Sequence, residues 1–241
     1  MVLRTLLASA VIAALTLLLG LPVLLVGPVD RSGHGVHALV RLWARLVLAI
    51  LGVRVAVSGL GNAPSGPAVW AANHSSALDI PILFGYLPVD FRIIHKRSLR
   101  LLPILGQAMW AAGHIAIDRS HPFRARRSLA SAAARIRAGT SVVVFPEGTR
   151  SPDDTVRRFK RGSFALALDA GVPVVPVSLI GVKAIVPRGL FSLQPGTVRV
   201  CVHTPVPVEG RGPAEAEKLA EEVRRVVAAG CAGAAAPTTE P

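Results

Sequence analysis

Short runs of β-branched and apolar residues alternate with longer stretches of helical spacing over most of this 241-residue chain. The short runs lie at residues 53–58, 67–72, 91–94, 114–117, 141–145, 174–179 and 197–203. The stretches with helical spacing lie roughly at residues 79–87, 121–138, 162–170 and 213–229. Strands that alternate with helices are typical of an α/β domain with a largely parallel sheet flanked by helices. We predict such a domain over residues 53–229, followed by a disordered tail over residues 230–241.

The amino-terminal part of the chain is apolar over a long run. From Thr5 to Val29 there are 25 consecutive residues without a charge, enough to cross the hydrocarbon core of a bilayer as a helix. The run is longer than the apolar core of a signal peptide, and no small-residue cleavage site ends it. Gly20 and Pro22 allow a break, so a helix that half-enters the bilayer is the alternative. We predict that residues 1–52 anchor the chain to a membrane, as one helix or as a two-helix hairpin.

A second apolar segment covers residues 36–53, with Arg41 and Arg45 four residues apart on one face. This pattern fits an interfacial helix or the second arm of a membrane hairpin, and it also fits an ordinary amphipathic core helix. More arginines follow the first apolar run than precede it. Because positive charge is enriched on the cytoplasmic side of membrane segments, we expect the main domain on the cytoplasmic side of the cell membrane.

The formal charge of +13 is carried mostly by arginine. Such an excess suits anionic lipid, a phosphorylated substrate or nucleic acid, although a composition bias toward arginine is also compatible with it. Nucleic acid is the weakest of these partners, because aromatic residues for base stacking are scarce. The two cysteines, Cys201 and Cys231, have no metal-ligand spacing, and no metal site is expected. Motifs for nucleotide cofactors and for serine hydrolases do not occur.

The stretch AANHSSALDIP at residues 71–81 places a histidine and an aspartate five positions apart. His74 follows an apolar run expected to be a strand, and the carboxyl ends of such strands are where α/β sheets bind ligands. A turn at Ser75 and Ser76 would let Asp79 orient the imidazole as a general base for an alcohol. Asp79 also suits the start of a helix, and Ser76-x-x-Asp79 matches a capping box. Taken alone, these residues favour capping.

The stretch VVVFPEGTRS at residues 142–151 is the second informative one. Gly148 permits close backbone approach, Thr149 offers a hydroxyl, and Arg150 offers a planar fork suited to phosphate. Glu147 could accept a proton or hold an arginine, and a surface ion pair in a simple turn is the alternative. Lys160 precedes an expected helix start, where the helix dipole favours anions.

Two further stretches complete the pattern. AAGHIAIDRS at residues 111–120 reads as a strand that ends in Asp118 and Arg119. GVPVVPVSL at residues 171–179 reads as a strand that contains Pro173 and Pro176. Because proline is poorly tolerated in a central strand, we expect this strand to be bent, to lie at an edge or to line a cavity.

In this order and spacing the four stretches resemble the glycerolipid acyltransferase superfamily, most closely the lysophosphatidate (1-acylglycerol-3-phosphate) acyltransferases. Residues 73–79 resemble the family's N-H-x-S-x-x-D block, and residues 145–151 match its third block without a departure. Residues 113–119 are similar to the second block, except that His114 stands where an aromatic or apolar residue is more usual. Val174-Val175-Pro176-Val177 looks like the fourth. The resemblance covers roughly residues 50–210.

The resemblance implies roles for single residues. It makes His74 and Asp79 the catalytic pair, with capping as a second duty of Asp79. It places Arg119 and the third block on the phosphate of the acceptor, and Pro176 on the acyl side. The implied substrate-binding residues are Arg119, Glu147, Gly148, Thr149, Arg150 and, more weakly, Lys160.

The resemblance also implies the reaction. An acyl group would pass from an acyl thioester, acyl-CoA or acyl-ACP, to the free hydroxyl of lysophosphatidate, giving phosphatidate in phospholipid biosynthesis. The membrane bilayer, lysophosphatidate and the thioester are then the partners, with no cofactor and no nucleic acid. Two alternatives remain: an acyltransferase for another lysophospholipid or lipid acceptor, and a non-catalytic, membrane-anchored basic module that binds lipid.

Overall fold

The computed structural model describes residues 2–30, 33–101, 105–118, 122–153, 155–186 and 194–233. Seven strands form one sheet in the order β1-β7-β6-β2-β5-β3-β4. The strands are β1 (Val53–Ser58), β2 (Val69–Ala72), β3 (Phe91–Lys96), β4 (Ile115–Ile117), β5 (Ser141–Val144), β6 (Val174–Ile180) and β7 (Gly196–Val202). Every strand pair is parallel except β6 with β7. The predicted α/β class and largely parallel sheet are confirmed.

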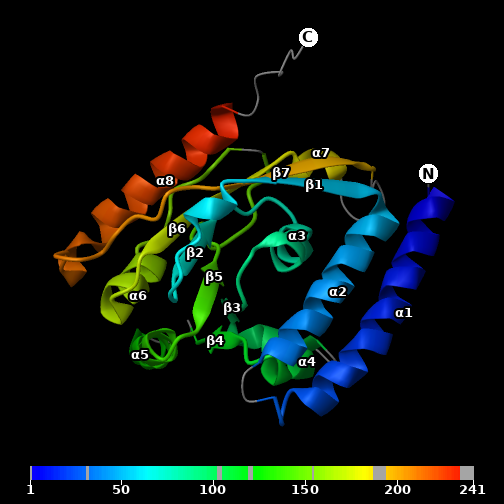
Figure 1. Cartoon of the computed structure of the whole chain (residues 1–241), viewed down its shortest axis with the longest axis horizontal. Helices are drawn as coiled ribbons and strands as arrows, with labels where there is room; N and C mark the ends of the chain where they lie inside the picture. Colours follow the sequence, from blue (N-terminus) through cyan, green and yellow to red (C-terminus); the bar gives the residue numbers. More distant parts are fainter. Residues whose placement is uncertain are drawn as a thin grey trace.

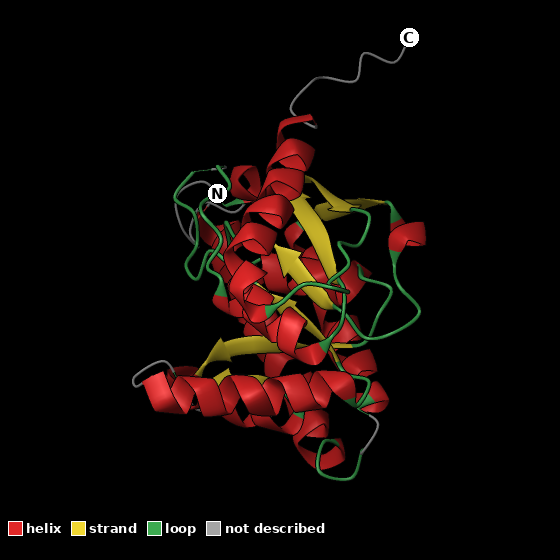
Figure 2. Ribbon diagram, turned by 90° about the vertical axis from the view of Figure 1, so that its left-hand side faces the viewer, coloured by secondary structure: helices red, strands yellow, loops and turns green. Residues whose placement is uncertain are grey.

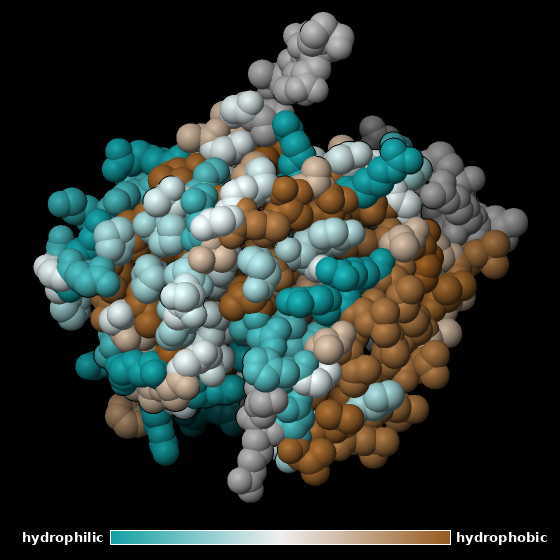
Figure 3. Space-filling view, viewed as in Figure 1, coloured by the Kyte–Doolittle hydropathy of each residue, from teal (hydrophilic) through white to brown (hydrophobic). Residues whose placement is uncertain are grey.

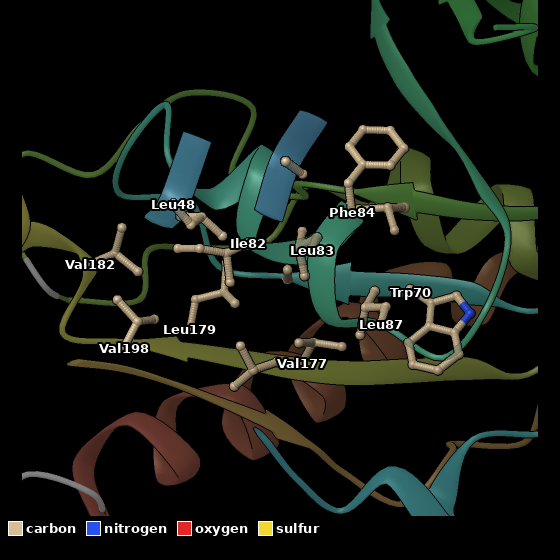
Figure 4. Packing of buried hydrophobic residues seen from close by; sticks show 14 of the residues in the cluster. Leu48, Trp70, Ile82, Leu83, Phe84, Leu87, Val177, Leu179, Val182 and Val198 are labelled. Atoms are coloured by element: carbon tan, nitrogen blue, oxygen red, sulfur yellow. The ribbon is translucent and has the colours of Figure 1, made fainter. Parts of the chain in front are cut away.

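Helices cover both faces of this sheet (Figures 1 and 2). The helices are α1 (Val2–Val26), α2 (His34–Leu51), α3 (Asp79–Tyr86), α4 (Leu105–Ala111), α5 (Pro122–Arg137), α6 (Gly162–Ala170), α7 (Val182–Ile185) and α8 (Ala216–Gly233). One apolar core lies between the sheet and α2, α3 and α7, and a second lies between the sheet and α5, α6 and α8. Figure 4 shows the first core, where Ile82 and Leu83 of α3 pack against Val177 and Leu179 of β6.

The predicted elements correspond closely to the observed ones. All seven expected strands form, and the four expected helices appear as α3, α5, α6 and α8. The short helices α4 and α7 were not predicted. Helix α8 continues to Gly233, so residues 230–233 of the predicted tail are helical because the apolar spacing of α8 carries the helix one turn further. The rest of that tail, residues 234–241, lies outside the described residues.

The amino-terminal segment forms a two-helix hairpin of α1 and α2. Helix α1 runs without a break through Gly20 and Pro22, and the indole Nε1 of Trp43 donates to Thr16 Oγ1 across the hairpin at 3.0 Å. By length and composition both helices could cross a membrane, with 6% of the α1 window and 33% of the α2 window buried inside the protein. Figure 3 shows hydrophobic surface gathered along α1. Most of the apolar surface of α1 is therefore exposed on the outside of the protein and does not pack in its interior.

Helix α2 has a different role, because it packs into the same core as the sheet through Ala44, Val47, Leu48 and Leu51. Arg41 donates to the carbonyl oxygens of Phe84 at 3.3 Å and Leu87 at 3.1 Å. Arg45 donates to the carbonyl oxygen of Gly85 at 3.0 Å. The two arginines thus satisfy main-chain carbonyls at the carboxyl end of α3, which helices otherwise leave without a partner. The amphipathic-core explanation of residues 36–53 holds for this face of α2, which braces α3.

Candidate active site

His74 and Asp79 meet at the carboxyl edge of the sheet. His74 follows the buried strand β2, and Asp79 is the first residue of α3. The turn between them brings the imidazole Nδ1 to 2.7 Å from Asp79 Oδ2. A carboxylate oxygen accepts hydrogen bonds, so Nδ1 carries the proton and the lone pair lies on Nε2. The His74 side chain is 14% exposed, which leaves the imidazole within reach of a substrate.

The same carboxylate also organises the turn before α3. Asp79 Oδ2 accepts from the amides of Ser75 at 2.8 Å and Ser76 at 2.9 Å, while Ser76 Oγ accepts from the amide of Leu78 at 3.3 Å. The predicted capping box forms only in part, because Ser76 Oγ accepts from the amide of Leu78 and not from that of Asp79. The N-cap residue of α3 is Leu78, and it makes no side-chain cap. One carboxylate oxygen therefore both holds the turn before α3 and orients His74. Asp79 is fully buried, and its Oδ1 has no hydrogen-bond partner among the described residues.

The loop after β5 fixes the main chain of His74. Glu147 Oε1 accepts from the His74 amide at 2.8 Å, and the amide of Ser151 donates to the His74 carbonyl oxygen at 2.7 Å. The ring of Phe145 stacks on the imidazole with centroids 4.1 Å apart and planes 23° apart. Two hydrogen bonds thus fix the main chain of His74, and stacking on Phe145 fixes the plane of its ring.

The Glu147 carboxylate links the turn at His74 to the loop at Arg157. Its carboxylate is buried, and Oε2 accepts from the amide of Arg157 at 3.4 Å in addition to the contact with His74. Burial raises the pKa of Glu147, while the amides of His74 and Arg157 oppose that rise. A buried acid already engaged by two main-chain donors is placed to position His74. Direct contact with a phosphate, the role expected from the resemblance, would set two negative charges together.

The cationic part of the same loop is exposed. Gly148 has φ +76°, a conformation that L side chains rarely adopt, and a Cβ there would lie 2.6 Å from Lys160 Nζ. Thr149 and Arg150 follow it and are exposed. The amide of Lys160 donates to the carbonyl oxygen of Pro146 at 2.9 Å. Lys160 is therefore brought against the loop, and two cationic side chains border the turn that fixes His74.

Of the two remaining expected site residues, only Pro176 falls among the described residues. Arg119 lies outside the described residues. Its neighbour Asp118 has Arg97 Nη1 at 3.1 Å and Arg124 Nη1 at 3.7 Å from Oδ2. Pro176 is buried within β6, opposite Ala71 of β2. Its acyl-side role stays a prediction that rests on the resemblance.

The surroundings of Pro176 explain how a proline fits inside the sheet. Strand β6 lies between β7 and β2, so an edge position is wrong. Val177 pairs with Val202, but Val174 pairs with Val206. Two residues of β6 thus face three on the other chain segment, which is a β-bulge. The proline, which has no amide hydrogen, sits at this interruption, where a ladder bond is not required.

Two residues that support His74 were not predicted as site residues. The Asn73 side chain donates to the Leu179 carbonyl oxygen at 2.9 Å and accepts from the Leu179 amide at 2.8 Å. It therefore extends the β2–β6 pairing by one residue and fixes where β2 ends before His74. Phe145 was quoted as part of the third block but not as a site residue. An amide side chain and an aromatic ring directly after two buried strands were the available signals.

The unusual His114 is a structural residue. It is buried, and its Nδ1 accepts from the amide of Ile93 at 3.3 Å. Burial, with a smaller contribution from Arg92, lowers the pKa of His114 to about 3. The imidazole is therefore neutral at physiological pH, which is compatible with an apolar position. In the described part of the chain, no three His, Cys, Asp or Glu side chains gather so as to hold a metal ion.

Replacing Glu147 by alanine is expected to reduce kcat and to lower the free energy of unfolding. The change leaves the amides of His74 and Arg157 without acceptors, at about 1–3 kcal/mol for each buried donor. Glu147→Gln keeps an oxygen for the His74 amide and should lie between the wild type and Glu147→Ala. Steady-state kinetics and thermal unfolding measure both effects. If Glu147→Ala raised only the KM for the acceptor, with kcat and stability unchanged, Glu147 would bind substrate directly.

The chain was compared with known proteins. Residues 54–180 match the family model described as Acyltransferase. The chloroplastic 1-acyl-sn-glycerol-3-phosphate acyltransferase LPAT1 of Arabidopsis thaliana is 37% identical over 82% of this chain and 56% of its own length. The 1-acyl-sn-glycerol-3-phosphate acyltransferase of Pseudomonas aeruginosa is 31% identical over 87% of this chain and 83% of its own. The chain thus spans little more than half of the plant protein and most of the bacterial one.

A solved structure gives the same answer for the fold. The crystal structure of the 1-acyl-sn-glycerophosphate (LPA) acyltransferase PlsC from Thermotoga maritima superposes with a TM-score of 0.84 at 30% sequence identity. The match covers 99% of this chain and 97% of that chain, so it includes the amino-terminal hairpin as well as the sheet. On these grounds the chain belongs to the acyltransferase family, among the 1-acyl-sn-glycerol-3-phosphate acyltransferases.

Proposed function

We propose that this protein transfers a fatty acyl group from an acyl thioester to the free hydroxyl of lysophosphatidate, giving phosphatidate. The observation that carries the proposal is the hydrogen bond of 2.7 Å between His74 Nδ1 and Asp79 Oδ2, bordered by an exposed cationic loop. A histidine oriented by a buried carboxylate is a general base for an alcohol. Family membership supplies the reaction class.

Because His74 Nδ1 is engaged by Asp79, Nε2 is the nitrogen that can act as the base. His74 Nε2 takes the proton of the acceptor hydroxyl, and Asp79 stabilises the imidazolium that forms. The hydroxyl oxygen attacks the thioester carbonyl carbon, and the carbon–sulfur bond of the resulting tetrahedral intermediate breaks. The departing sulfur recovers the proton from His74, so the enzyme ends the cycle unchanged. No serine nucleophile takes part: the neighbouring Ser75 is buried, with its amide held by Asp79.

The exposed loop supports a phosphate-bearing acceptor. Arg150 and Lys160 provide positive charge beside His74, and Thr149 provides a hydroxyl. In lysophosphatidate the phosphate lies only a few bonds from the reacting hydroxyl. A cationic group within a short distance of His74 therefore fixes the hydroxyl by holding the phosphate, and positioning of this kind supplies much of the rate. Arg119 remains a further predicted contact.

The hairpin supports a membrane location, which is consistent with an acceptor and a product that reside in lipid. The apolar, exposed face of α1 suits insertion into the bilayer. We propose that the catalytic domain lies on the cytoplasmic side of the cell membrane, because arginines follow the first apolar helix. The thioester donor, acyl-CoA or acyl-ACP, would then approach from the cytoplasm.

Arg150→Ala is expected to raise the KM for lysophosphatidate roughly 10- to 100-fold, because a charge-assisted hydrogen bond to phosphate is lost. The assay follows a labelled acyl chain into phosphatidate in vesicles, with Arg225→Ala, an exposed arginine of α8, as the matched control. Lysophosphatidylcholine and monoacylglycerol serve as competing acceptors. Acylation of either of these in preference to lysophosphatidate would assign the enzyme another acceptor, and acylation of none would remove the proposed function.

A further inference from the structure

A cationic cavity lies apart from the loop of Arg150, between the edge strand β4 and helix α5. It has a volume of about 460 Å³. Helix α5 lines it with Arg124, Arg127, Ser131 and Arg135, which are spaced three or four residues apart and so share one face. Arg97, which follows β3, also lines it. A cavity of this size is in the range that holds a small ligand.

The charge of this cavity is not balanced by the residues that line it. Four arginines face one carboxylate, that of Asp118, which pairs with Arg97 and Arg124. Arg135 donates to the Gly113 carbonyl oxygen at 2.8 Å, which carries no formal charge. Arg127 has no carboxylate partner in the described part of the chain. A ligand with more than one negative charge would complete the site.

The phosphate of the acceptor is too close to its reacting hydroxyl to extend to the α5 side of this cavity during the reaction. Strand β4 is three positions from β2 in the sheet, with β5 and β3 between them. Three strand spacings amount to about 14 Å. The phosphate and the reacting hydroxyl of lysophosphatidate are joined by only two carbons and an oxygen. With the hydroxyl at His74, the phosphate lies within reach of the loop of Arg150 and does not extend to the arginines of α5.

A longer substrate can reach both places. The carboxyl ends of β2, β5, β3 and β4 share one edge of the sheet because these strands are parallel. Asp118 and Arg97 therefore stand at the same edge as His74. In coenzyme A the thiol and the phosphates are separated by the extended pantetheine arm, and the nucleotide end carries a pyrophosphate and a 3′-phosphate.

We propose that the cavity between β4 and α5 binds the phosphate groups of the coenzyme A part of the acyl donor, with Arg127 as a principal contact. The inference rests on the proposed function and adds to it the donor class and the donor site. A pocket lined by arginines suits a small polyanion. The phosphopantetheine arm of a carrier protein has a single phosphodiester, so the arm itself brings less negative charge to this cavity than coenzyme A does.

Arg127→Ala tests the inference, with Arg126→Ala as the matched control. Both arginines are exposed on α5, but Arg126 does not line the cavity. Arg127→Ala is expected to raise the KM for acyl-CoA about 10-fold, from the loss of a charged hydrogen bond to phosphate. It should leave kcat and the KM for lysophosphatidate within about twofold of the wild type. Arg126→Ala should resemble the wild type in all three.

Donors that lack phosphates sharpen the test. With acyl-pantetheine, the wild type and Arg127→Ala should have the same kcat/KM. With acyl-dephospho-coenzyme A, which lacks the 3′-phosphate, the two kcat/KM values should differ less than they do with acyl-CoA. Equal KM values for the two arginine variants would overturn the inference. So would a rise confined to the lysophosphatidate KM, or an effect seen only with acyl carrier protein.

A binding measurement separates this inference from the proposed function. Adenosine 3′,5′-bisphosphate, titrated calorimetrically into the full-length protein, should bind the wild type at least 10-fold more tightly than Arg127→Ala, with inorganic phosphate as the competitor. This result does not require turnover. Binding without acyl transfer would remove the proposed function and keep the site, whereas transfer without a difference in binding would remove the site and keep the function.

Discussion

Replacing His74 by alanine is expected to lower kcat by about 10²–10⁴-fold, the usual contribution of a general base. The imidazole is the acid-base group whose Nε2 is left free by the bond from Nδ1 to Asp79. Alanine leaves the His74 main chain, and therefore its bonds with Glu147 and Ser151, in place. The substitution should thus lower kcat and leave the KM values and the free energy of unfolding nearly unchanged.

The measurement is acyl transfer to lysophosphatidate in vesicles, together with vesicle binding and thermal unfolding of the same variant. His34→Ala is the matched control, because His34 is an exposed histidine of α2 that pairs with Asp90. His34→Ala should retain activity. Undiminished turnover by His74→Ala would remove His74 from the mechanism. Loss of vesicle binding along with activity would favour the lipid-binding module over the enzyme.

Asp79→Asn is expected to lower kcat on the order of 10³–10⁴-fold, by analogy with the carboxylate of a catalytic triad. The amide cannot supply the negative charge that stabilises the imidazolium of His74. Its oxygen can still accept from the amides of Ser75 and Ser76, so the turn is retained. Its NH₂ group then takes the place of the buried Oδ1, which has no partner among the described residues.

Asp79→Ala separates the two duties of this residue. It removes the acceptor for both serine amides, so the free energy of unfolding should fall by about 1–3 kcal/mol for each donor left without a partner. Asp169→Asn, an exposed acid on α6, is the control for both variants. Kinetics and chemical denaturation provide the two readouts. Full activity of Asp79→Asn would leave Asp79 with only the structural task of holding the turn at Ser75 and Ser76.

The strands and the residues at their ends could be predicted because local pattern decides both. Apolar and β-branched runs mark buried strands, and His74 and the third block follow two of them directly. That the two runs are neighbours in the sheet was not predictable from either. The contact of Glu147 with the His74 amide depends on this pairing, so its positioning of His74 could not be predicted from the sequence. The expected contact of Glu147 with the acceptor stays a prediction.

The arginines of α2 show a second limit. Arg41 and Arg45 have the spacing of a polar helix face, which fits either a membrane surface or the protein interior. Their partners are carbonyl oxygens at the end of α3, about 40 residues further along the chain. Every residue has a main-chain carbonyl, so the sequence does not show which carbonyl an arginine will contact. Only the packing of α2 on α3 distinguishes the two explanations. Pro176 is similar, because the bulge that accommodates it is formed with a distant segment.

The measurement that tests the account most directly is release of thiol from an acyl thioester by the membrane-bound wild type, with and without lysophosphatidate. Direct transfer at His74 predicts one thiol released for each phosphatidate formed, and almost none without acceptor. Equal release in the absence of acceptor would indicate a hydrolase or an acyl-enzyme and contradict the mechanism. No release from acyl-CoA or acyl-ACP with any lysolipid would contradict the proposed function itself.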